Sequence, residues 1–122
     1  MTWVTIGIFG LLGIFCRWSA DIFLQKYNYP VPISTLGVNL LGCLMAGLIF
    51  TLSQSKSLIS PTLATGLIVG FCGGLTTFSA YSLQAFNLLS KGRIGLALGY
   101  LLLSPIVGIL AAYLGTKIAE QF

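Results

Sequence analysis

The chain has 122 residues, of which 57% are hydrophobic and only 7% are charged. Ordinary soluble domains carry about 25% charged residues, so this composition excludes a soluble fold and predicts an integral membrane protein. The net charge of +4 comes from six Lys and Arg residues against two acids. These charges are single and scattered, whereas nucleic-acid binding requires a clustered basic patch. We therefore expect no nucleic-acid partner.

The residues that most enzyme sites require are also missing. The chain has no histidine, and both acids lie near the ends of apolar segments, so general acid–base catalysis lacks its usual groups. The three cysteines are an odd number placed inside apolar stretches, which argues against a disulfide framework and a zinc site. We expect no enzymatic activity and a packing role for Cys16, Cys43 and Cys72.

Four apolar segments are long enough to cross a bilayer, which takes about 20 residues of helix. The first starts near the N-terminus without a basic region, so we expect a retained membrane helix rather than a signal peptide. The connections are short and polar or contain proline, so neighbouring helices must run antiparallel. The chain is therefore predicted to be a single four-helix membrane domain, residues 1–122, with spans at 3–24, 33–52, 63–89 and 94–118.

The third segment contains residues that form helices poorly. Its middle, residues 70–79, reads GFCGGLTTFS, in which paired glycines precede two threonines. One interpretation is a broken helix, whose free carbonyl and amide groups would provide a place for ions. The other is an intact helix with a small-residue packing face, because Gly66, Gly70 and Gly74 are spaced four apart. These residues alone favour neither interpretation.

The charged residues give the chain little preference for one direction of insertion. The loops after the first and third spans carry Lys26 and the basic residues of 91–93, whereas the opposite side carries Lys56 and Lys117. This bias is weak under the positive-inside rule. Two oppositely oriented copies could therefore pair as an inverted dimer. The alternative is one fixed orientation, set by Arg17 and the third loop.

Polar side chains at membrane depth are costly unless they find a partner or line a pathway. Those of this chain are mostly neutral hydrogen-bond donors, and a wall of such donors suits a small anion. Taken singly, each could instead bond to the backbone one turn away or bridge two helices. Tyr100 and Ser104 share one helix face with Gly108. The neutral donors are Asn39, Thr77, Ser79, Tyr100 and Ser104, and Thr76 is a further polar residue next to Thr77.

Three aromatic residues, Phe71, Phe78 and Tyr81, surround the middle of the third segment. Aromatic ring edges carry partial positive charge, so an anion can approach them without being trapped by a full cation. For Phe71 the alternative is simple packing against neighbouring helices. The aromatic residues therefore add to the prediction of an anion pathway.

Three stretches of the chain resemble motifs of the CrcB/Fluc fluoride channel family. Residues 70–79 look like the third-helix motif of that family, which is highly specific. Residues 10–18, GLLGIFCRW, resemble its first-helix pattern, and residues 35–42, TLGVNLLG, resemble its second-helix pattern. The length, the four spans and the charge balance agree with the family over the whole chain.

The resemblance implies an all-α integral membrane fold, with four transmembrane helices and a broken third helix, assembled as an inverted (dual-topology) dimer with two pores. It implies a structural Na⁺ at the dimer centre, held by backbone carbonyls of Gly73 and Thr76. It also implies passive export of cytoplasmic fluoride across the cell inner (plasma) membrane. The expected partners are fluoride, membrane lipid and a second subunit, with a homodimer favoured over a heterodimer of paralogues.

The same resemblance implies roles for individual residues. Asn39 would donate to fluoride at a pore entrance, and Phe78 would present a ring edge. The chain departs from the family pattern at Ser34, Ala80, Tyr81 and Gly108, which leaves the heterodimer open. The other implied positions are Thr77, Ser79, Tyr81, Tyr100 and Ser104 in the fluoride pathway and Arg17 near a vestibule.

Two other functions suit a small four-helix membrane protein. An exporter of the small multidrug-resistance type would also be an inverted dimer, but it needs a buried carboxylate, and both acids here lie near helix ends. A non-conducting membrane assembly subunit would use the small residues only for packing. The neutral donors and the third-helix motif favour the fluoride channel over both.

Overall fold

The computed structural model describes residues 1–122 as helices joined by short loops. Four helical segments are long and apolar enough to cross a membrane: Thr2–Gln25, Ile33–Gln54, Pro61–Ser90 and Ile94–Ala119. Each begins and ends within two residues of its expected position. The all-helical prediction with four membrane-spanning segments is therefore confirmed.

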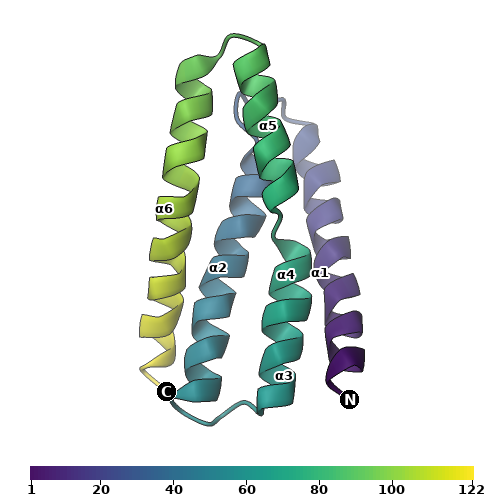
Figure 1. Cartoon of the computed structure of the whole chain (residues 1–122), viewed down its shortest axis with the longest axis vertical. Coiled ribbons are helices and arrows are strands. Elements are labelled where there is room, and N and C mark those ends of the chain that lie inside the picture. The colour runs from purple at the N-terminus through teal and green to yellow at the C-terminus, as the bar shows by residue number, and fades with distance from the viewer.

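The third segment is composed of several helical pieces. Ser60 begins it as a helix cap, because its hydroxyl accepts a bond from the Leu63 amide and Pro61 occupies the first turn. The helices are α1 (Thr2–Gln25), α2 (Ile33–Gln54), α3 (Pro61–Thr65), the π-helical stretch η1 (Gly66–Cys72), α4 (Gly73–Leu75), α5 (Phe78–Ser90) and α6 (Ile94–Ala119). Figure 1 shows both termini and the α2–α3 loop at one end of the bundle, with the α1–α2 and α5–α6 loops at the other.

Glycines of η1 and α4 allow α1 to pack closely against the third segment. A Cβ added at Gly70 would lie 2.7 Å from the Ile6 carbonyl oxygen, and one at Gly74 would lie 3.2 Å from the Ile14 amide nitrogen. Both distances are shorter than ordinary contacts, so these positions require glycine. Small residues of this kind let membrane helices approach one another. The predicted glycine packing face is thus present in the half of the segment before Thr76.

Phe71 packs on the same side of the bundle as the small core formed by Ile49, Ala64 and Cys72. Phe71 therefore packs against neighbouring helices, which was one of the two interpretations of this residue. Most other large apolar side chains are exposed on the outer face of the chain, among them Phe15 and Trp18. Such a surface suits lipid, which is as apolar as these side chains.

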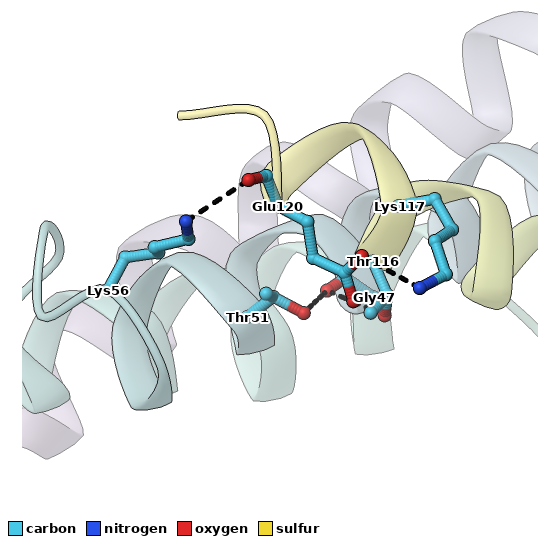
Figure 2. Close-up of polar contacts among 6 residues, drawn as sticks. All are labelled: Gly47, Thr51, Lys56, Thr116, Lys117 and Glu120. Carbon is cyan, nitrogen blue, oxygen red and sulfur yellow. Dashed lines mark hydrogen bonds and ion pairs between the residues drawn. The ribbon is translucent and has the colours of Figure 1, made fainter.

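Close packing also joins α2 to α6. A Cβ added at Gly115 of α6 would lie 2.9 Å from the Leu48 amide nitrogen of α2. The hydroxyls of Thr51 and Thr116 both donate to the Gly47 carbonyl, at 3.0 and 3.4 Å. Figure 2 shows the two hydroxyls converging on this carbonyl from their separate helices. The Gly47 carbonyl of α2 thus accepts one hydrogen bond from its own helix and one from α6, and the second bond links the two helices inside the packed interface.

The end of α6 is tied to the loop after α2. The Lys56 ammonium group donates to the Glu120 carbonyl oxygen at 3.1 Å, which satisfies a free carbonyl at the helix end. The Glu120 carboxylate pairs with Lys117 at 2.7 Å on the exposed surface (Figure 2). This pair joins two residues at the end of the same helix, and exposed ion pairs contribute only about 0–1 kcal/mol.

Candidate ion pathway

The backbone of the third segment is extended at Thr76 and Thr77, between α4 and α5. Thr76 has φ −87° and ψ 158°, and Thr77 has φ −152° and ψ 125°. The Thr76 hydroxyl donates to the Cys72 carbonyl at 2.9 Å. The Thr77 hydroxyl accepts the Ala80 amide at 3.3 Å and so caps α5. The first threonine therefore closes one helix and the second begins the next.

Asn39 of α2 holds this extended stretch in place. Its Oδ1 accepts the Thr77 amide at 2.8 Å, and its Nδ2 donates to the Thr77 carbonyl at 3.3 Å. Because the Thr77 amide is bonded to Asn39, it does not donate to the Gly73 carbonyl one turn back, as it would in a continuous helix. The Asn39 amide has a second N–H, which neither bond uses. Asn39 thus fixes the backbone and retains one donor.

A groove of about 480 Å³ lies between α2, the extended stretch and α6. Its wall combines apolar side chains with a few neutral polar groups and contains no charged residue. Ligand sites commonly have this composition, with few polar groups on an apolar wall. The structure brings these predicted residues together in the groove: Asn39, Thr76, Thr77, Phe78, Tyr81 and Ser104.

Ser104 is distinct among the groove residues because its hydroxyl has no partner. Its Oγ is the only buried side-chain nitrogen or oxygen in the chain without a hydrogen bond. Such a group costs about 1–3 kcal/mol when it stays unsatisfied, and a bound water or ion is one common explanation. On its α6 side the groove therefore contains a buried hydroxyl with no hydrogen-bond partner, in addition to the second N–H of Asn39 on the α2 side.

The Tyr81 hydroxyl is engaged by the backbone of α6. It donates to the Leu101 carbonyl at 2.7 Å. Pro105 lies inside α6 and has no N–H, so the Leu101 carbonyl has no helical donor. The Tyr81 ring stays at the groove, with its centroid 5.8 Å from that of Phe78 and 5.0 Å from that of Tyr100. The hydroxyl that departs from the family pattern thus serves as a link between helices.

Tyr100 is buried beside the groove rather than in its wall. Its hydroxyl donates to Gln84 Oε1 at 3.1 Å, and Gln84 Nε2 donates to the Thr35 hydroxyl at 2.8 Å. Sequence reasoning missed Thr35 and Gln84. For Thr35 the available signal was spacing, because it lies four residues before Asn39 on the same face of α2. No such signal marks Gln84, since Thr77 is extended and lies outside the helix that carries Gln84. Neutral polar side chains are therefore also hydrogen-bonded to one another beyond the groove, from Tyr100 through Gln84 to Thr35.

Besides Tyr100, three further predicted residues lie outside the groove. Ser79 is exposed, with its Oγ 3.4 Å from Thr77 Oγ1. Arg17 is half-buried on α1 and has no carboxylate partner, since the only ion pair lies at the end of α6. Gly73 is exposed, and its carbonyl lacks the Thr77 amide as a donor. The structure therefore does not bring Arg17 into one site with Asn39, whereas Ser79 contacts the groove residue Thr77 from outside the groove wall.

The extended stretch offers only oxygen atoms as metal ligands. No group of three His, Cys, Asp or Glu side chains that could hold a metal occurs in the chain. The Gly73 carbonyl is free of its usual helical donor, and hard cations take carbonyl oxygens as ligands. The donor set thus fits a hard cation that draws further ligands from outside one chain.

A second cavity, of about 280 Å³, lies around the α1–α2 loop. Asp21 lies within α1, one turn before its last residue, and accepts a hydrogen bond from the Ser34 hydroxyl of α2. Gln84, which bonds to Tyr100, also lines this cavity. The polar residues of its wall are Asp21, Gln25, Asn28, Tyr29, Ser34 and Gln84.

The chain is similar to a large set of known proteins over nearly its whole length. The family model described as "CrcB-like protein, Camphor Resistance (CrcB)" matches residues 4–116. A protein of Chlorobium phaeobacteroides strain BS1, named fluoride-specific ion channel FluC, is 42% identical over 115 residues, which cover 94% of this chain and 90% of the relative. A protein of Geotalea daltonii with the same name is 40% identical, with 98% and 97% covered. A Pseudomonas syringae protein, also of this name, is 39% identical, with 98% and 97% covered. With its four membrane-spanning helices, this chain is therefore a multi-pass membrane protein of the CrcB family.

Proposed function

We propose that this protein is a fluoride channel and that the groove is part of its ion pathway. The observation that carries this proposal is the buried, unpartnered Ser104 hydroxyl in a groove whose other polar groups are neutral. Fluoride binds its hydration water strongly, so a pathway must replace that water with hydrogen-bond donors. Conduction also requires binding weak enough for exit, which neutral hydroxyls, one amide and ring edges provide. The relatives named fluoride-specific ion channels support this choice of anion.

Flow through the channel is passive in this proposal. The sequence contains no phosphate-binding glycine motif that would couple transport to a nucleotide. A negative-inside membrane potential drives an anion outward with about 2.3 kcal/mol per charge per 100 mV. The proposed role is therefore export of cytoplasmic fluoride across the plasma membrane, which lowers its concentration in the cell.

The proposed functional unit is an inverted dimer of two identical four-helix domains, each comprising residues 1–122. Phe78 is 79% exposed in the single chain, next to extended backbone at Thr76 and Thr77. Non-helical backbone at membrane depth is stable only when protein or water covers it. A second copy would supply that cover, and the weak charge difference between the two loop sides allows it to insert in the opposite direction.

A structural Na⁺ between the two copies would bind backbone carbonyls that the extended stretches leave without a hydrogen-bond donor. The Gly73 carbonyl has lost its helical donor, and the proposed ligands are the carbonyls of Gly73 and Thr76 from both copies. When bound, the ion supplies the positive charge that these oxygens require. The residues of the chain itself position the oxygens, because Asn39 holds the Thr77 amide away from Gly73.

The two rival functions explain less of the structure. A proton-coupled exporter needs a buried carboxylate at its transport site, and the groove wall contains none. A non-conducting assembly subunit accounts for the glycine packing of α1 against η1, but not for a groove that gathers Asn39, Thr77 and Ser104. The fluoride channel accounts for both features.

The test is fluoride efflux from liposomes that contain only this purified protein, started by valinomycin and followed with a fluoride electrode. We expect rapid fluoride efflux while parallel vesicles retain chloride. Ser104→Ala should slow the efflux, whereas Ser82→Ala, a serine of α5 that lines neither cavity, should not. Absent fluoride efflux, or equal efflux of chloride, contradicts a self-sufficient fluoride-selective homodimer.

A further inference from the structure

We infer that the cavity around the α1–α2 loop is a mouth of the ion pathway, and that the Asp21 carboxylate in its wall restricts access of anions. This inference rests on the proposed function, because it concerns the rate at which fluoride reaches the groove. It assigns a role to the one acidic side chain that faces a cavity, a residue with no place in the groove itself.

The first step is the connection between the two cavities. Gln84 lines the loop-end cavity, and its Oε1 accepts the Tyr100 hydroxyl at 3.1 Å. The Tyr100 ring lies 5.0 Å from the ring of Tyr81, which lines the groove. An amide, a hydroxyl and two aromatic rings therefore lead from one cavity to the other, and none of them is charged. In this inference, an anion that crosses the groove follows these side chains to the loop-end cavity.

The second step is the polarity of the loop-end cavity. Most of its polar side chains are neutral amides or hydroxyls, contributed by the end of α1, the loop, the start of α2 and α5. Asn28 lies in the loop with φ 45°, a left-handed conformation that asparagine tolerates better than most residues. A cavity of about 280 Å³ with such a wall can hold several waters. It is thus a suitable place for a hydrated ion to begin losing its water.

The third step is the unbalanced charge of Asp21. The chain has only two acids, and the other, Glu120, is paired with Lys117 at the opposite end of the bundle. Asp21 accepts a bond from the neutral Ser34 hydroxyl and has no cation within ion-pair distance. Its negative charge therefore remains at the cavity wall. A charge at the mouth of a path changes the local concentration of the permeating ion. The basic residues at this end of the bundle, Lys26 and those of 91–93, attract fluoride, and the Asp21 carboxylate in the cavity wall opposes that attraction.

The experiment compares wild-type protein with Asp21→Asn in the liposome efflux assay, at subsaturating fluoride and at two ionic strengths set by an impermeant salt. The amide is nearly isosteric with the carboxylate and can still bond to Ser34. We expect Asp21→Asn to raise fluoride efflux by roughly twofold to tenfold at low ionic strength, from charge removal at a distance of several ångströms. The gain should largely disappear near 1 M salt, where the Debye length falls to about 3 Å.

Asn28→Asp provides the reciprocal variant, which adds a carboxylate to the same cavity at a loop position. It should slow fluoride efflux at low ionic strength and approach the wild-type rate at high ionic strength. Ser34→Ala removes the hydrogen bond but keeps the charge, and Glu120→Gln removes an equal charge outside the cavity. Neither control should show a salt-dependent acceleration. Asp21→Glu keeps the charge and should not show the salt-dependent acceleration expected for Asp21→Asn.

The possible outcomes separate the inference from the proposed function. If wild-type protein conducts fluoride but Asp21→Asn and Asn28→Asp leave the low-salt rate unchanged, the mouth assignment is wrong. An acceleration that persists at 1 M salt overturns the charge mechanism, because it shows a structural effect. If wild-type protein conducts no fluoride, the proposed function fails, and this inference fails with it. Size-exclusion chromatography of each variant establishes that altered rates do not come from misfolding.

Discussion

The Tyr81 hydroxyl donates a 2.7 Å hydrogen bond to the Leu101 carbonyl, which Pro105 leaves without a helical donor. A residue of α5 thereby satisfies a backbone group of α6 within the membrane-spanning part of the chain. Unsatisfied backbone groups are especially costly there, because lipid offers no replacement partner. Tyr81 and Pro105 consequently act as a pair, and the bond holds the aromatic ring at the groove.

Replacing Tyr81 tests this pairing. We expect Tyr81→Phe to destabilise the protein by about 1–3 kcal/mol, because the Leu101 carbonyl is left unpaired. Pro105→Ala restores an N–H to α6, so Tyr81→Phe should cost less in that background. A double-mutant cycle of unfolding in detergent measures this coupling. Tyr113→Phe is the control, since Tyr113 is exposed and its hydroxyl forms no bond. Equal costs in both backgrounds would show that Pro105 is not involved.

Replacing Asn39 tests the two bonds that hold the extended stretch. Asn39→Ala removes both contacts with Thr77, each worth about 0.5–1.5 kcal/mol, so thermal stability should fall. Fluoride efflux should fall at least tenfold, because the groove wall loses its shape as well as a donor. Asn39→Asp keeps an acceptor for the Thr77 amide but adds a charge, so we expect better stability than Asn39→Ala with equally poor efflux. Full efflux from Asn39→Ala would remove this residue from the pathway.

Gln84→Leu tests the polar connection between the two cavities. The substitution leaves the Thr35 and Tyr100 hydroxyls without their present partner, and we expect fluoride efflux to slow severalfold. Asn87→Leu, an exposed polar residue further along α5 that lines neither cavity, is the matched control and should conduct normally. Normal efflux from Gln84→Leu would show that ions leave the groove by another route.

Glycine substitutions test the close packing of α1. Gly70→Ala should destabilise the protein by about 1–3 kcal/mol through overpacking, since its Cβ would lie 2.7 Å from the Ile6 carbonyl. A Cβ at Gly7, on α1, would have nothing within 4 Å. Gly7→Ala should therefore be neutral or stabilising by up to about 1 kcal/mol, as alanine favours helix. Chemical or thermal unfolding in detergent decides the comparison, and equal effects would argue against a packing role for Gly70.

Removing sodium tests the proposed structural ion. Protein exchanged into a buffer with a large organic cation should melt at a lower temperature than protein in sodium, because a ligand bound only to the folded state stabilises it. Returning sodium should restore the melting temperature in a concentration-dependent way. A melting temperature that is independent of sodium would contradict the proposed site at Gly73 and Thr76.

Several features of this protein follow from local sequence. Composition determines the membrane class, because so few charged side chains cannot cover a soluble surface. The four spans agree with the structure to within two residues, since helix length and hydropathy are properties of a contiguous segment. The extended residues Thr76 and Thr77 also fall inside the stretch 70–79 that stood out from its composition. Helical spacing identifies which residues share a face, such as Gly70 and Gly74.

Only the tertiary structure decided which faces meet. The bond from Gln84 to Thr35 joins residues 49 positions apart, and the bond between Thr77 and Asn39 joins residues 38 apart. Helical periodicity defines a face but not its partner, so neither Gln84 nor the link from Tyr81 to Leu101 could be derived from the chain alone. Asp21 is the same case: an acid near a helix end is ordinary in sequence, and its place in a cavity depends on how α1, α2 and α5 pack together.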